Sequence, residues 1–152
     1  MGTYLNEGKL LYARAVNSEI HVDKSLLIRE TNRRICTQDQ YICLSRPRRF
    51  GKSMAAHMLM AYYARGAGSR DLFADKKIYS DPSFETHFGK YNVIHLRMTD
   101  FVADGIDAMG ADVLSTLKID IAQEEQELRR TDEKLAEKPL VFSKPDSLPR
   151  VL

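Results

Sequence analysis

A glycine–lysine–serine triplet at residues 51–53 separates two segments of different character. Residues 40–45 form a short, mostly apolar run of β-prone side chains, which predicts a buried strand. Residues 52–64 are apolar nearly all round, which predicts a buried helix. Pro47 lacks a backbone donor and Gly51 permits unusual dihedrals, so neither element is expected to continue through the intervening loop. The predicted order is therefore strand, loop, helix.

This arrangement matches the second half of the phosphate-binding signature G-x-x-x-x-G-K-[ST]. In such a loop, consecutive backbone amides and the positive end of the helix face an anion. Lys52 is the predicted catalytic residue, because its ammonium group would reach the β- and γ-phosphates, and the Ser53 hydroxyl is the predicted Mg²⁺ ligand. The predicted ligands are ATP and Mg²⁺, and the predicted binding residues are Arg46, Pro47, Arg48, Arg49, Phe50, Gly51, Lys52, Ser53 and Met54.

Three alternatives compete with this prediction. The triplet also fits a plain turn followed by a solvated helix start. Arg46 occupies the position of the signature's first glycine, so the loop either keeps its anion site or has lost part of it and binds weakly. Arg46, Arg48 and Arg49 could instead contact a nucleic-acid backbone, although a net charge of +2 gives that hypothesis little support.

The remaining pattern favours an α/β fold, because strand-like and helix-like segments alternate. Asp23 or Ser25 is expected to cap the second helix. The predicted helices cover residues 8–16, 25–35, 52–64, 69–73 and 81–88 and a long segment from residue 104, and the predicted strands cover residues 20–22, 40–45 and 91–96.

The sequence LSRPRRFGKS at residues 44–53 resembles the signature loop of the bacterial AAA-ATPase-like family. Residues 17–25, NSEIHVDKS, resemble the family's (F/Y)VDK(T/S) element, and residues 69–73 and 91–96 resemble its next elements. The resemblance covers roughly residues 3–140. It implies an ATP-binding P-loop NTPase with a three-layer sandwich, in which arginine is usual at position 46.

The resemblance also implies a Walker B strand that ends in Asp-Glu, and often a restriction-endonuclease-like domain through which nucleic acid would be bound. The nearest candidate strand, residues 93–100, ends at Asp100 without a following glutamate. We therefore expect an incomplete P-loop domain over residues 1–140 and a disordered tail over residues 141–152. Such a fragment would bind nucleotide without efficient hydrolysis, unless it is a truncated product without function.

The cysteines favour a cytoplasmic location. Cys36 and Cys43 have no metal-binding spacing, which favours reduced thiols. No segment resembles a signal peptide or a membrane span. The sequence leaves the oligomeric state and the choice between ATP and GTP open.

Overall fold

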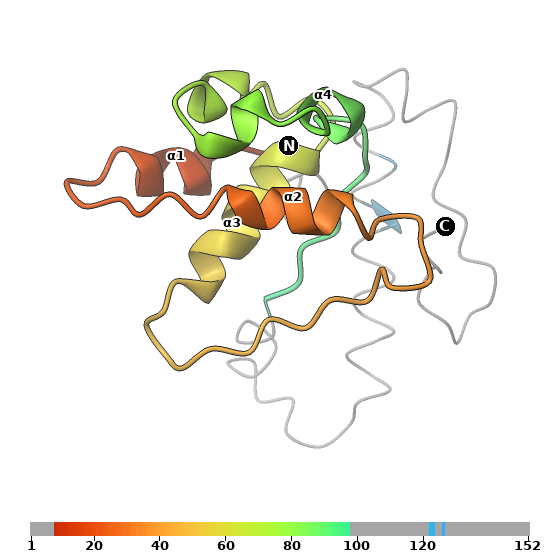
Figure 1. Ribbon diagram of the computed structural model, residues 1–152, viewed down its shortest axis with the longest axis horizontal. Coiled ribbons are helices and arrows are strands. Elements are labelled where there is room, and N and C mark those ends of the chain that lie inside the picture. The colour runs from red at the N-terminus through yellow and green to blue at the C-terminus, as the bar shows by residue number, and fades with distance from the viewer. Residues whose placement is uncertain (1–7, 98–121, 124–125, 127–152) are drawn as a thin grey trace. The chain divides into compact units, whose positions relative to one another are not determined.

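The computed structural model describes residues 8–97, 122–123 and 126 (Figure 1). The chain divides into two compact units, one formed by Asn6–Val93 and the other by Met1–Leu5 together with Ile94–Leu152. The first unit contains α1 (Leu10–Val16), α2 (Leu26–Asn32), α3 (Lys52–Tyr63), η1 (Arg70–Phe73), η2 (Lys77–Ser80) and α4 (Phe84–His87). The fold is described for this unit.

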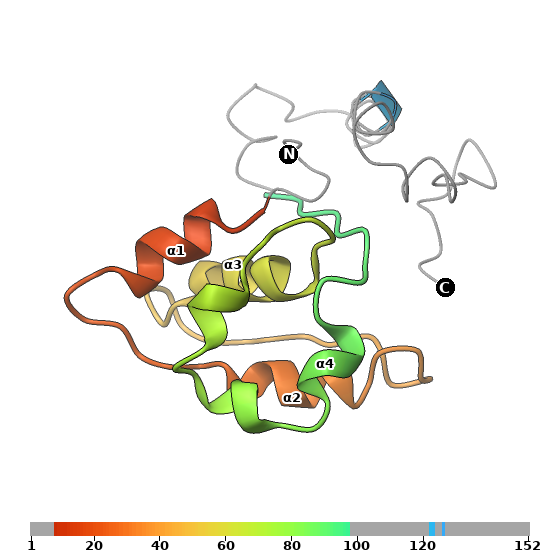
Figure 2. The same cartoon turned by 90° about the horizontal axis from the view of Figure 1, so that it is seen from above.

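The helix α3 confirms the prediction for residues 52–64 almost residue by residue. Its first turn is exposed at Lys52 and Ser53, whereas most of its later residues are buried. It ends at Tyr63, and the next residue, Ala64, has an extended backbone. The contacts of α1 with α3 cover part of this apolar surface (Figure 2).

The core is built around the ring of Tyr62, which is 0% exposed. Ring centroids lie 5.8 Å away in Phe73, 5.3 Å in Phe84 and 5.6 Å in Phe88. The Tyr62 hydroxyl donates a 2.7 Å hydrogen bond to the Phe84 carbonyl and accepts one of 3.0 Å from the Asn32 side-chain amide. Burial raises the pKa of Tyr62 to about 12, so the hydroxyl stays protonated and keeps its donor role.

The same core joins helices that are far apart in the sequence. Asn32 also accepts a 2.6 Å hydrogen bond from the Tyr63 hydroxyl, which ties α2 to α3. Contacts of η2 with both α2 and α4 complete the packing. Because each buried polar group in this network has a partner, the helices can pack closely without the cost of a buried, unsatisfied hydroxyl or amide.

The predicted α/β three-layer sandwich is wrong for the described residues, which form helices and no strand. Residues 40–47 carry no regular structure (Figure 1), and Tyr41 is 88% exposed. Tyr91 makes only an isolated parallel bridge with Ala64. A strand requires a neighbour that bonds to its amides and carbonyls. Among the described residues, the segments at residues 20–22 and 40–45 have no such ladder, and the segment at residues 91–96 contains isolated bridge residues rather than a strand.

Other predicted helices are confirmed in shortened form. The segments at residues 8–16, 25–35, 69–73 and 81–88 correspond to α1, α2, η1 and α4. Of the two predicted caps of α2, Ser25 makes no side-chain capping bond, whereas the Asp23 carboxylate accepts a 2.8 Å hydrogen bond from the Ser25 amide just before the helix. The helix predicted from residue 104 falls almost wholly outside the described residues, and Asp100 and the tail at residues 141–152 lie outside them entirely. Among the described helices, none has the length and apolar character needed to cross a membrane.

Candidate nucleotide-binding site

The loop between Arg46 and α3 contains two residues with a positive φ, a conformation that few side chains adopt. Arg49 has φ of 68° and Gly51 has φ of 74°, whereas Phe50 between them has no positive φ. Left-handed residues in a turn can direct successive amides toward one side, as in the concavities of proteins that bind anions. A left-handed arginine is strained by about 1–2 kcal/mol, and strain of this kind gathers at functional sites.

The first turn of α3 adds amide donors to this loop. The earliest α3 amide with a helical partner is that of Ala55, which donates a 3.0 Å hydrogen bond to the Gly51 carbonyl. Across residues 8–97, the amides of Lys52, Ser53 and Met54 find no acceptor. Unpaired amides at a helix amino terminus, together with the helix dipole, favour an anionic ligand.

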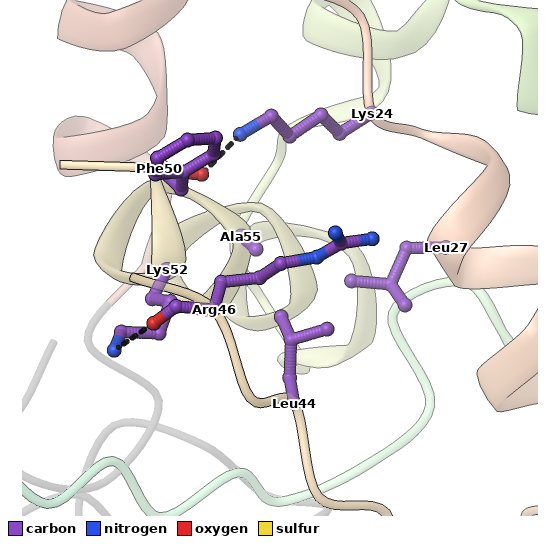
Figure 3. A pocket seen from close by; sticks show the side chains of 7 residues that line it. All are labelled: Lys24, Leu27, Leu44, Arg46, Phe50, Lys52 and Ala55. Atoms are coloured by element: carbon purple, nitrogen blue, oxygen red, sulfur yellow. Dashed lines mark hydrogen bonds between the residues drawn. The ribbon is translucent and has the colours of Figure 1, made fainter. Parts of the chain in front are cut away.

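The side chain of Lys52 folds back over the loop. Its ammonium group donates a 2.7 Å hydrogen bond to the Arg46 carbonyl (Figure 3). This bond joins the first residue of the loop to the first residue of α3. It therefore holds the lysine side chain against the loop that leads into the unpaired amides of α3.

A pocket of ≈ 330 Å³ lies beside the loop (Figure 3). Its lining combines three cationic side chains with four apolar ones and contains no carboxylate. The lining residues are Lys24, Leu27, Leu44, Arg46, Phe50, Lys52 and Ala55. Such a lining suits a ligand that has an anionic part and an apolar, planar part.

The structure brings some predicted site residues together and leaves others apart. Arg46, Phe50 and Lys52 line the pocket, and the Arg46 guanidinium extends toward Leu27 (Figure 3). Arg48 and Arg49 are exposed and form no ion pair with a described residue. The remaining members of the predicted set, Pro47, Gly51, Ser53 and Met54, belong to the loop and first turn but not to the pocket lining.

Lys24 is a pocket residue that the sequence did not reveal. Its ammonium group donates a 2.7 Å hydrogen bond to the Phe50 carbonyl, across 26 positions of sequence. The expected helix cap at Asp23 or Ser25 therefore did not indicate this role of the intervening lysine. The signal was present in the VDK element at residues 22–24, but its spacing alone does not indicate which loop the lysine would meet.

The neighbours of Lys24 hold its backbone against η2. Asp23 accepts hydrogen bonds from the amides of Ser25, at 2.8 Å, and Lys77, at 3.1 Å. The Ser25 hydroxyl accepts one from the Ile78 amide at 3.2 Å. Burial pushes the pKa of Asp23 upward, but the amide donors of Ser25 and Lys77, together with the Ser25 side chain and the positive charge of Lys76, leave this pKa below its usual value.

Replacing Asp23 by alanine is expected to lower the free energy of unfolding by about 1 kcal/mol at pH 7, because both amides lose their acceptor. The depressed pKa makes this contribution complete above the unfolded pKa of about 4, and it disappears as the pH falls through the folded pKa. Urea unfolding at pH 7 and pH 3 measures the difference. Asp39→Ala, at an exposed position, is the control and should change little at either pH.

The family to which the chain belongs follows from one comparison. A sequence model described as predicted AAA-ATPase matches residues 14–145. The chain belongs to this family. The match confirms the resemblance seen in the sequence and includes both Lys24 and the loop at residues 46–53. No curated protein and no solved structure matches the chain.

Proposed function

We propose that this member of the predicted AAA-ATPase family binds a nucleoside triphosphate together with Mg²⁺ at the loop of residues 46–53. The observation that carries the proposal is the position of Lys52 at the head of α3, with its ammonium group over the loop at the Arg46 carbonyl. Three adjacent features support it: left-handed Arg49 and Gly51, unpaired amides in the first turn of α3, and a pocket lined by cations without a carboxylate.

Different residues are expected to contact different parts of the ligand. Loop amides and the ammonium group of Lys52 would hold the phosphates, and the exposed Ser53 hydroxyl would bind Mg²⁺. Leu27, Leu44 and Phe50 offer an apolar surface for the nucleoside. The Mg²⁺ ion, when bound, would neutralise phosphate charge. The proposal concerns nucleotide binding. We also propose a cytoplasmic location, because both cysteines are free thiols.

Isothermal titration with Mg·ATP tests the proposal. Lys52→Ala should weaken binding by about 10- to 100-fold, since a charge-assisted hydrogen bond contributes about 1.5–3 kcal/mol. Lys90→Ala is the matched control, because Lys90 is also exposed and also donates a 2.7 Å hydrogen bond to a carbonyl, that of Thr86. Equal heats from the wild-type protein and Lys52→Ala would rule the proposal out.

Nucleic-acid binding is the second candidate, because Arg48 and Arg49 are exposed and unpaired among the described residues. It is less well supported than nucleotide binding, since Arg46 lines the pocket beside Lys24 and Lys52 and so does not complete a separate arginine surface. A double variant, Arg48→Ala with Arg49→Ala, should reduce the affinity and salt dependence for DNA only if this candidate is correct. Unchanged DNA affinity in that variant excludes it.

A further inference from the structure

Lys24 is not part of the loop at residues 46–53, but its side chain contacts that loop. Its side chain is half-buried, and its ammonium group bonds to the Phe50 carbonyl. A Cβ atom built on Gly51 would lie 2.5 Å from the same ammonium nitrogen. The nitrogen is therefore in close contact with the backbone of residues 50–51, at the place where the loop enters α3.

The approach of Lys24 to the loop is fixed by its own backbone. The flanking residues Asp23 and Ser25 both bond to amides of η2, so the segment at residues 23–25 is attached on either side of the lysine. A side chain that extends from an anchored backbone loses less freedom when it meets a ligand. This anchoring favours a binding role over an incidental surface contact.

The charge of Lys24 has no acidic partner among the described residues. A lysine ammonium has three donors, and Lys24 uses one of them on a carbonyl. Arg46 and Lys52 line the same pocket, so three positive charges surround a space without a carboxylate. Lys24 is half-buried, whereas Arg46 and Lys52 are exposed. An anion placed in this pocket would be attracted by all three charges and would reduce their mutual repulsion.

The two lysines contact different ends of the loop. Lys52 bonds to the carbonyl of Arg46 and Lys24 to that of Phe50 (Figure 3). We propose that Lys24 is a second ammonium contact for the phosphates, and that the ligand class is a polyphosphate chain long enough to meet both lysines. This inference rests on the proposed nucleotide binding.

Isothermal titration of the full chain with Mg·ATP and with Mg·tripolyphosphate tests the role of Lys24. The variants are Lys24→Met, Lys24→Arg and, as a control, Lys90→Met. Lys24→Met should weaken both ligands by about tenfold, and by similar factors, because the tripolyphosphate has no nucleoside. Lys24→Arg, which keeps the charge, should restore most of the affinity, and Lys90→Met should match the wild-type protein.

The outcomes separate this inference from the proposed function. If the wild-type protein binds Mg·ATP and Lys24→Met binds it within twofold, the Lys24 contact is wrong while nucleotide binding stands. A loss for Mg·ATP without a loss for tripolyphosphate also overturns the contact, since it places Lys24 at the nucleoside. Thermal melts of the ligand-free variants show whether Lys24→Met still folds. If it does not, the affinity of Lys24→Arg for the two ligands tests the contact instead. Absence of any wild-type binding overturns both proposals.

Discussion

Replacing Tyr62 by alanine is expected to lower the free energy of unfolding by about 3–5 kcal/mol, the usual result of removing a large buried aromatic ring. The ring is fully buried and packs against Phe73, Phe84 and Phe88. Its hydroxyl also bridges Asn32 and the Phe84 carbonyl. Since small domains have a stability of about 5–15 kcal/mol, the loss is a large share of the total. Urea unfolding followed by circular dichroism measures it.

Two control variants separate the contributions to this effect. Tyr62→Phe keeps the ring and removes the hydroxyl, so it should cost about 1–3 kcal/mol for the groups left without a partner. Tyr41→Ala removes a tyrosine that is 88% exposed, and should change stability by less than about 0.5 kcal/mol. Similar stabilities for Tyr62→Ala and Tyr41→Ala would contradict the packing of the Tyr62 ring in this core. A wild-type chain without a cooperative transition would support the alternative of a product that does not fold stably.

Replacing Gly51 by alanine is expected to weaken Mg·ATP binding by about tenfold or more. At φ of 74° an added Cβ would lie 2.5 Å from the Lys24 ammonium nitrogen, so the lysine must move away from the loop. The left-handed conformation itself becomes less favourable by about 1–2 kcal/mol. Isothermal titration reports the affinity, and urea unfolding reports the stability.

Gly66 provides a matched control for this substitution. It also has φ of 74°, but an added Cβ would meet nothing within 4 Å. Gly66→Ala should therefore lose a similar amount of stability and keep its affinity for Mg·ATP. If both variants lose affinity equally, backbone strain rather than the position of Gly51 explains the result, and the assignment of the loop loses this support.

The helix α3 and the loop before it could be predicted because their signals are local. An almost uninterrupted apolar sequence predicts a buried helix, and glycine at position 51 predicts an unusual dihedral. The strand predicted for residues 40–45 failed for the opposite reason. Its apolar, β-prone side chains fit a pleated surface, but a strand depends on neighbours supplied by other parts of the chain, and the described residues supply none.

The contribution of Lys24 could not be predicted for a related reason. Its bond to the loop spans 26 residues, and it depends on how residues 23–25 attach to η2. The sequence suggested that Asp23 or Ser25 caps α2, and the Ser25 hydroxyl instead accepts a hydrogen bond from the Ile78 amide. The hydroxyl of a serine before a helix can accept a hydrogen bond from several backbone amides. The packing of η2 against α2 determines which amide donates it here.

The bonds from Lys52 and Lys24 to the carbonyls of the loop have a consequence for affinity. Each ammonium group has three donors, and in the described residues each uses one of them on a loop carbonyl, that of Arg46 or Phe50. A phosphate that reaches these ammonium groups would meet the remaining donors while the bonds to the loop stay in place. The same internal acceptors keep both lysines positioned before the ligand arrives, so little ordering of these side chains remains for the ligand to drive.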